Sequence, residues 1–232
     1  MMEGAKAAYR AMLAIDDETS RLVRFVLRAL AGRESPRVFD VGCGYGRTLR
    51  ALRDAGVQAT GIDVNLEIVE RNNIDGLECL LPEDFRARGL AADVLVMSHV
   101  VEHFAPRDLL AFIDGYLEFL RPGGFLVLAT PLLTDRFFDD FDHVKPYQPT
   151  GLGMVFGGRQ SQVQYYGRST LALEDIWFRR SAFSITFAKG MYVRNWTTPV
   201  WRIVNLGYAL LFRSSGGLIG RTTGWVGLYR KV

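Results

Sequence analysis

The sequence has few cysteines and histidines and lacks a long hydrophobic run. Its 232 residues include 2 cysteines and 3 histidines. Two thiols, Cys43 and Cys79, exclude a disulfide framework and a cysteine-rich metal cluster, so a reduced, cytoplasmic chain is the default expectation. The most apolar late stretch, residues 200–212, is interrupted by Arg202 and Asn205 and is too short to span a bilayer. No secretory signal peptide is expected, because the first residues are charged.

Acidic residues are scarce in the last third of the chain. Residues 151–232 carry 11 Lys+Arg against only Glu174 and Asp175, whereas residues 1–150 carry 17 Lys+Arg against 23 Asp+Glu. The net charge of +3 therefore hides two unlike parts. This asymmetry favours an anionic partner for the C-terminal third, such as a phosphorylated substrate, a membrane surface or nucleic acid. The alternative to an anionic partner is an arginine-rich face that is simply exposed to solvent.

Short apolar runs alternate with amphipathic stretches through the first 131 residues. Residues 5–31 predict N-terminal helices with a break near Asp16. Strands are then expected at 38–41, 59–64, 77–81, 93–98 and 125–130, and helices at 47–55, 66–72, 84–88 and 107–120. This alternation predicts a parallel sheet covered by helices on both faces.

The regular alternation ends after Pro131. About forty residues without a clear period precede an expected helix at 170–180, and two further strands are expected at 183–188 and 226–231. A second insertion, residues 190–224, separates these strands. Insertions of this length are usually functional.

Four motifs follow the predicted strands in order. The first strand ends in Asp40 and three glycines at alternate positions, Gly42, Gly44 and Gly46, directly before a helix. Glycines let the backbone approach a ligand closely, but Arg47 occupies the sixth position, so a dinucleotide pyrophosphate turn is disfavoured. The other motifs are Asp63 after the second strand, residues 99–104 after the fourth, and the Arg-Pro-Gly-Gly turn at 121–124.

On these motifs the sequence resembles the class I S-adenosylmethionine-dependent methyltransferases, in particular small bacterial enzymes of polysaccharide and glycan pathways. The resemblance covers roughly residues 37–131. It implies a Rossmann-like, doubly wound α/β fold with a seven-stranded sheet whose last strand is antiparallel. We expect a single domain that comprises N-terminal helices (1–34), a cofactor-binding half (35–131), substrate-side insertions with one strand (132–224) and the last strand (225–232).

The resemblance also implies a set of cofactor-binding residues for S-adenosylmethionine. The glycine turn would flank the methionine part, Asp40 would lie near its ammonium group, and Asp63 would hold the ribose hydroxyls. Asp84 or Glu83 would accept from the adenine amino group, although acidic residues also simply favour a helix start. The full expected set is Asp40, Gly42, Cys43, Gly44, Gly46, Asp63, Val64, Glu83, Asp84, Phe85, Ser98 and His99, with Phe85 covering the adenine ring.

Two histidines are candidates for catalysis. A base near the acceptor's hydroxyl proton assists methyl transfer, and histidine is the commonest choice. His143 is the preferred candidate, because residues 140–147 are similar to an Asp-x-x-His-Val-basic-Pro-Tyr element of glycan-pathway methyltransferases; a structural role in the loop is the alternative. His103 is the second candidate. Glu102 and His103 alone make weak evidence for a metal, so no metal site is expected.

The expected function is O-methylation of a glycan, a nucleotide sugar or a lipid-linked cell-envelope precursor. The alternatives are methylation of an isoprenoid or quinone hydroxyl at the membrane face, and a non-catalytic binding protein that keeps the fold. Aromatic residues interleaved with arginines at 194–221 favour peripheral contact with the inner face of an anionic membrane, with a buried helix as the other interpretation. Nucleic acid is disfavoured, because the Asn/Asp-Pro-Pro-aromatic signature is absent after the fourth strand.

Overall fold

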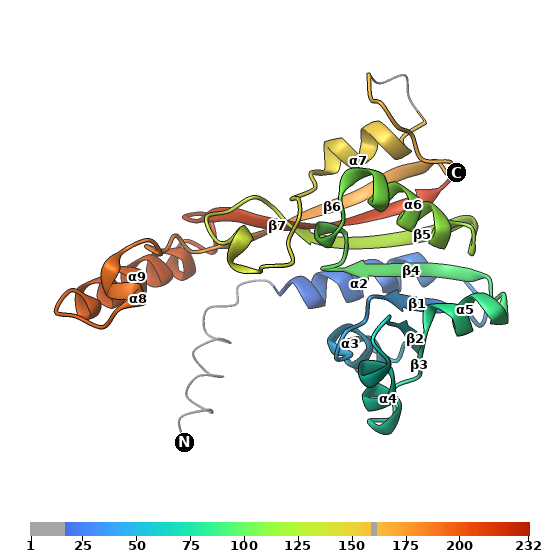
Figure 1. Ribbon diagram of the computed structural model, residues 1–232, viewed down its shortest axis with the longest axis horizontal. Helices are drawn as coiled ribbons and strands as arrows, with labels where there is room; N and C mark the ends of the chain where they lie inside the picture. Colours follow the sequence, from blue (N-terminus) through green and yellow to red (C-terminus); the bar gives the residue numbers. More distant parts are fainter. Residues whose placement is uncertain (1–16, 159–161) are drawn as a thin grey trace. The chain divides into compact units, whose positions relative to one another are not determined.

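The computed structural model describes residues 17–158 and 162–232. In this part of the chain, seven strands form one sheet in the order β3-β2-β1-β4-β5-β7-β6 (Figure 1). The strands are β1 (Val38–Val41), β2 (Ala59–Ile62), β3 (Cys79–Leu80), β4 (Ala92–Ser98), β5 (Leu120–Pro131), β6 (Leu171–Ser181) and β7 (Arg221–Lys231). Strands β1 to β5 pair in parallel, and the last strands are antiparallel. The predicted fold class is confirmed.

Helices connect the parallel strands as the alternating pattern predicts. They are α3 (Arg47–Asp54), α4 (Leu66–Ile74), α5 (Pro82–Arg88) and α6 (Pro106–Leu117); α2 (Glu18–Leu30) precedes β1, and α7 (Pro149–Phe156) follows β5. Two 3-10 turns, η1 (Val101–His103) and η2 (Phe137–Asp139), lie in the loops after β4 and β5. The predicted strands and helices between residues 38 and 131 are confirmed, with shifts of up to three residues at most ends. The exception is β5, which begins at Leu120 and so includes residues 121–124, where a turn was expected. The expected helix before residue 17 lies outside the described residues.

The two larger of the three apolar core clusters lie on opposite faces of the sheet. In β4, Leu95 and Met97 pack into the cluster that contains α5, α6 and α7, whereas Val94 and Val96 pack with α2 and α3. Successive side chains of a strand point to opposite faces, so the continuous apolar run of β4 is buried on both sides.

The helix expected at 170–180 is wrong, because these residues form the edge strand β6. Its side chains alternate between the two faces: Ile176 packs against one core cluster and Trp177 against the other. Charged residues interrupt the apolar alternation, as is common at a sheet edge, where charge discourages pairing with other chains. The sequence therefore lacked the clean period of a buried strand.

The strand expected at 183–188 is also wrong, since these residues have no regular structure. The side-chain amide of Asn205 takes the place of a strand partner: the Ile185 N–H donates to Asn205 Oδ1 at 2.7 Å, and Asn205 Nδ2 donates to the Ile185 carbonyl at 3.1 Å. Backbone polar groups need such partners when they are shielded from water. The partner of β7 is therefore β6, and residues 183–188 are outside the sheet.

The chain divides into two compact units. One contains residues 18–177 and 225–232, and residues 178–224 belong to the other. The second unit contains α8 (Lys189–Tyr192) and α9 (Thr198–Ser214). No helix in the described ranges is long and apolar enough to cross a membrane.

Candidate active site

The glycine turn after β1 adopts a backbone that other residues disfavour. Gly42, Gly44 and Gly46 have φ angles of +73°, +51° and +74°. A Cβ atom on Gly42 would lie 2.5 Å from Val100 Cγ2, whereas one on Gly44 would meet nothing within 4 Å. The turn therefore needs glycine for its left-handed conformation, and at Gly42 also for close packing.

Asp63 fastens this turn to the end of β2. Its Oδ2 accepts from the Gly44 N–H at 2.9 Å, and its Oδ1 accepts from the Asn65 N–H at 3.0 Å. A carboxylate has about four lone-pair positions, so both oxygens retain capacity for ribose hydroxyls. Asp63 and Val64 line a cavity of about 260 Å³, together with Gly42, Pro82, His99 and Tyr116.

Asp40 is buried beneath the turn without a hydrogen bond to its Oδ2 from any described residue. Burial raises the pKa of its carboxyl from 3.8 to about 8, and the nearby Asp63 adds to this shift. A buried carboxyl without a partner is costly when ionised. The site is therefore suited to a ligand that brings a cationic group.

The structure corrects the roles expected for Phe85 and Cys43. Phe85 is 0% exposed and packs on Phe39 and Tyr116, so its side chain belongs to the core and is not available to cover an adenine ring. The Cys43 side chain points behind the turn, where its sulfur lies 3.3 Å from that of Cys79. The two thiols are thus neighbours despite their separation in the sequence.

The other expected cofactor residues lie around the same sheet edge. Ser98 ends β4 and is partly buried, and Pro82 supplies the contact of α5 with the cavity. Glu83 and Asp84 are exposed in the first turn of α5 and are not among the residues that line the cavity. Their contact with an adenine amino group stays a prediction.

His99 lies between two carboxylates at the rim of the cavity. Its Nε2 is 2.6 Å from Glu18 Oε1, and its Nδ1 is 3.1 Å from Glu102 Oε1. Burial lowers the pKa of His99, but the hydrogen bonds and charges of Glu102 and Glu18 outweigh it and raise the pKa to about 9. With both ring nitrogens donating, His99 is an imidazolium ion. Its backbone has a φ of +57°, a strained conformation that is concentrated at functional sites.

Sequence reasoning missed Glu18, Phe112 and Tyr116. Glu18 opens α2 and reaches His99 across 81 positions of sequence, which no local pattern signals. Phe112 and Tyr116 line the cavity from α6, and their helical spacing resembles that of ordinary core residues.

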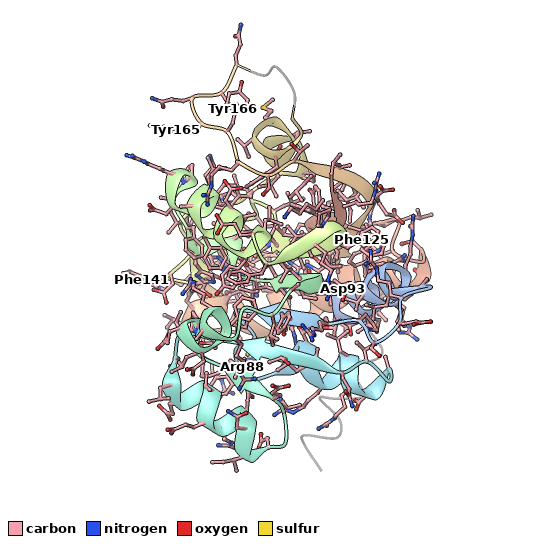
Figure 2. The ribbon with its side chains drawn as sticks, turned by 90° about the vertical axis from the view of Figure 1, so that its right-hand side faces the viewer. Arg88, Asp93, Phe125, Phe141, Tyr165 and Tyr166 are labelled. Carbon is pink, nitrogen blue, oxygen red and sulfur yellow. The ribbon has the colours of Figure 1, made fainter. Side chains whose placement is uncertain are left out.

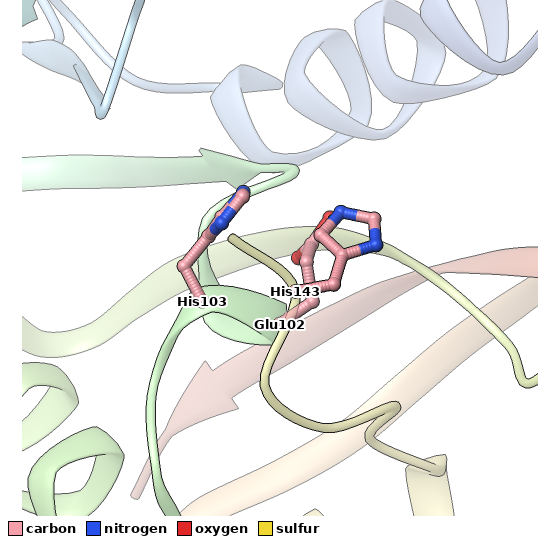
Figure 3. A group of neighbouring side chains, drawn as sticks. All are labelled: Glu102, His103 and His143. Atoms are coloured by element: carbon pink, nitrogen blue, oxygen red, sulfur yellow. The ribbon is translucent and has the colours of Figure 1, made fainter. Parts of the chain in front are cut away.

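Glu102, His103 and His143 converge beside the cavity (Figure 3), where one potential ligand atom from each lies within 4.8 Å of the others. The convergence depends on the loop after β5. The N–H groups of Val144 and Lys145 donate to the Glu102 carbonyl at 2.8 and 3.1 Å, which holds His143 next to η1. The two candidate catalytic histidines are therefore brought together, with ring centroids 5.0 Å apart.

Hydrogen bonds fix the tautomers of both imidazoles. His143 Nδ1 lies 2.6 Å from the Phe137 carbonyl, and His103 Nδ1 lies 3.1 Å from the Asp142 carbonyl. A carbonyl oxygen only accepts, so each Nδ1 carries the proton and each Nε2 has a free lone pair when the ring is neutral. Both histidines can thus accept a proton or bind an electrophile through Nε2.

Comparison with known proteins agrees with this architecture. Residues 14–182 match the family model of a methyltransferase domain. The chain belongs to this methyltransferase family. Its fold resembles that of a SAM-dependent methyltransferase from Archaeoglobus fulgidus, with a TM-score of 0.60, 20% identity and 92% of each chain covered.

Curated relatives match a shorter part of the methyltransferase. This chain is 32% identical over 111 residues to the ubiquinone biosynthesis O-methyltransferase of Chelativorans sp. strain BNC1. The match covers 44% of this chain and 43% of that protein. It is 36% identical over 103 residues to the protein of the same name from Xanthomonas campestris, with 40% and 42% covered. The matches span less than half the length of these relatives.

The residues of the cavity and of the adjacent glycine turn fit S-adenosylmethionine, the methyl donor that this methyltransferase fold uses. Asp40, buried next to Val41 of the cavity lining, has no partner on Oδ2 among the described residues and suits the donor's ammonium group. Asp63 offers oxygens to two ribose hydroxyls. The glycine turn leaves its backbone open at Gly44.

Proposed function

We propose that this methyltransferase transfers a methyl group from S-adenosylmethionine to a hydroxyl group on an isoprenoid-bearing or quinone-type ring. The observation that carries the proposal is the pair of imidazoles with free Nε2 atoms beside the cofactor cavity, because O-methylation needs a group that receives the hydroxyl proton.

The cofactor half of the chain supplies binding and orientation. Gly42, Gly44 and Gly46 admit the methionine part, Asp40 pairs with the ammonium group, and Asp63 holds the ribose. Ser98, His99 and Val64 border the same edge, with Glu83 and Asp84 as candidates toward the adenine. When bound, S-adenosylmethionine supplies a methyl group already activated by the positive sulfur, so positioning contributes much of the rate.

His143 acts on the acceptor's hydroxyl group, with His103 beside it. The His143 side chain is only 13% exposed, and its Nε2 lies 3.7 Å from Asp140 Oδ2 and 4.0 Å from Glu102 Oε1. Both carboxylates therefore lie near the nitrogen that receives the proton. The Phe137 carbonyl fixes the ring so that Nε2, not Nδ1, receives it.

A ring hydroxyl is favoured over the glycan or nucleotide-sugar acceptor that the residue 140–147 element suggests. The curated relatives bear the name ubiquinone biosynthesis O-methyltransferase, which supports a ring hydroxyl. The histidines are compatible with both classes, because a histidine serves the hydroxyl of a sugar and of a ring equally well.

Cofactor binding and acceptor choice have separate tests. We expect S-adenosylhomocysteine to bind the wild type in calorimetry, and Asp63→Ala to weaken binding at least about tenfold, a loss of about 1.4 kcal/mol. The exposed Glu70→Ala on α4 is the control. Equal affinity of Asp63→Ala and wild type would refute the site, and no binding at all would favour a protein that keeps the fold without turnover.

Transfer of labelled methyl groups then identifies the acceptor. We expect prenylated catechols and hydroxyquinones to be methylated and nucleotide sugars not to be, with His143→Ala lowering turnover while cofactor affinity stays intact. Methylation of sugars alone would overturn the acceptor class.

We also propose that the unit of residues 178–224 docks on an anionic lipid surface, where ring acceptors with isoprenoid tails reside. On α9, Val200, Ile203, Leu206 and Leu210 recur at helical spacing and are all more than 40% exposed. Residues 178–224 include arginines and Lys189 but no acidic residue. Exposed apolar stripes beside cations are typical of helices that lie in a membrane interface.

Flotation with vesicles tests this docking. We expect the methyltransferase to float with phosphatidylglycerol-containing vesicles at low salt and to be released by Ile203→Glu. Ile74→Glu is the matched control, because Ile74 is equally apolar and 82% exposed but lies on α4. Wild-type protein that stays at the bottom with anionic vesicles, or equal effects of the two variants, would refute the docking surface.

A further inference from the structure

The cluster of Glu102, His103 and His143 has the donor set of a metal site, although Glu102 and His103 alone did not predict one. Two imidazole nitrogens and one carboxylate oxygen are a frequent ligand set for divalent transition metals. One atom from each residue lies within 4.8 Å of the others. Ligands of a tetrahedral zinc ion lie roughly 3.4 Å apart, as bonds of about 2.0–2.1 Å require, so a modest contraction would close the set.

Hydrogen bonds to backbone carbonyls orient the two imidazole rings of this cluster, as is usual for metal-bound histidines. Both histidines donate Nδ1–H to backbone carbonyls, of Asp142 and Phe137, which directs the Nε2 lone pairs to the cluster. Such second-shell hydrogen bonds fix the tautomer and the ring of metal-bound histidines.

The third ligand, Glu102, is fully buried and is held from both sides. Its Oε2 accepts from Thr130 Oγ1 at 3.0 Å, and its Oε1 accepts from His99 Nδ1 at 3.1 Å. Both carboxylate oxygens keep a lone pair for a cation beside these bonds. Asp140 Oδ2, 3.7 Å from His143 Nε2, brings a second carboxylate to the cluster.

We propose that Glu102, His103 and His143 bind a divalent first-row transition-metal ion, such as zinc or manganese, that coordinates the acceptor's oxygen. This inference rests on the proposed methyl transfer to a hydroxyl group. It replaces the role of His143 as a direct base, because both Nε2 atoms bind the ion and solvent receives the proton. His103 also lines the cofactor cavity, so an oxygen held at the cluster is next to the methyl donor's site.

The reaction step balances without a further reactant. The coordinated hydroxyl group loses its proton to solvent, because a cation lowers the pKa of a bound hydroxyl. Its oxygen then forms a bond to the methyl carbon as the bond between that carbon and sulfur breaks, and the bonding electron pair returns to sulfur. The products are the methyl ether, S-adenosylhomocysteine and one proton.

Cobalt provides a test that does not depend on turnover. Chelator-treated, untagged protein is titrated with Co²⁺, and visible absorption reports coordination by nitrogen and oxygen ligands. We expect a saturable band in the wild type that Zn²⁺ displaces. His103→Ala and His143→Ala should each lower Co²⁺ affinity at least about tenfold, since loss even of outer-shell partners costs 10–100-fold.

Asp142→Asn is the matched control, because it changes an exposed side chain beside His143 but keeps the carbonyl that orients His103. Its affinity should equal that of the wild type, and circular dichroism of each variant checks that it folds. The metal site would be overturned if the wild type showed no visible Co²⁺ absorption band or no heat of Zn²⁺ binding. It would also be overturned if the histidine variants bound Co²⁺ as tightly as the wild type. If S-adenosylhomocysteine still binds and His143→Ala still impairs transfer, the proposed function survives with His143 as a direct base.

Discussion

Replacing Asp40 by asparagine should change stability and cofactor affinity in opposite directions. The folded-state pKa of Asp40 is about 8, against 3.8 for an ordinary aspartate. Between these values the unfolded state loses its proton and the folded state keeps it, so the stability that neutral Asp40 contributes is full below pH 3.8 and is lost as the pH rises toward 8. Asp40→Asn has no such loss.

The magnitude follows from linkage. Each pH unit in this window changes the free energy of unfolding by about 1.4 kcal/mol, so raising the pH from 5 to 7 costs the wild type about 3 kcal/mol through Asp40. The difference between Asp40→Asn and wild type should therefore grow by about 3 kcal/mol over this interval. Any cost of burying the amide is the same at both pH values and does not affect this change.

Urea unfolding of the cofactor-free protein at pH 5, 6 and 7 measures the effect. Asp54→Asn is the control, because the Asp54 side chain is 77% exposed and its replacement should give no comparable change. A stability difference between Asp40→Asn and wild type that stays constant with pH would refute the assignment of a protonated Asp40.

The same carboxyl should report cofactor binding. At pH 7, a pKa of about 8 leaves Asp40 about 90% protonated, and pairing with an ammonium group favours ionisation. Binding of S-adenosylhomocysteine to wild type should therefore release up to about 0.9 proton more than binding to Asp40→Asn, which should also bind more weakly. Calorimetry in buffers of different ionisation enthalpy measures the release, and equal values for the two proteins would contradict the pairing.

Two further predictions concern the turn and the core. Gly46→Ala should destabilise the protein more than Gly56→Ala. Both glycines have a positive φ, which costs alanine about 1–2 kcal/mol of strain. Only at Gly46 would the new Cβ also meet Leu77 Cδ1, at 2.6 Å. Equal unfolding midpoints of these two variants would show that the turn relaxes. Phe85→Ala should cost about 3–5 kcal/mol in urea unfolding, whereas Phe141→Ala, at a side chain that is 98% exposed and points outward in Figure 2, should stay within about 0.5 kcal/mol of wild type. A small effect at Phe85 would argue against its place in the core.

The parallel half of the fold was predictable because its signals are local. Buried parallel strands are continuous apolar runs, and each is followed by a turn and a helix, so β1, β4 and α6 could be located from neighbouring residues alone. The turn expected at 121–124 is wrong, because these residues lie within β5. Arg121 has a structural role there: it pairs with Asp93, which also binds Arg33 (Figure 2 labels Asp93).

The antiparallel half was harder, because its signals depend on position in the sheet. Residues 171–181 are an edge strand in which two pairs of charged residues interrupt the apolar pattern, and no period of two or of 3.6 dominates. Residues 183–188 are apolar enough for a strand, but Asn205, from a helix twenty positions later, satisfies the backbone instead.

The fold class, the glycine turn and the acidic residues at the ends of β1 and β2 could be predicted from the amino-acid sequence, because each follows from residues that are adjacent in the chain. The use of the histidines depends on the three-dimensional arrangement. His99 became a charged group between Glu18 and Glu102, and His143 came to lie beside His103 because the backbone of Val144 and Lys145 binds the Glu102 carbonyl. Contacts between residues forty or eighty positions apart leave no periodic trace, so the chemistry of this site depends on long-range packing that a sequence pattern does not record.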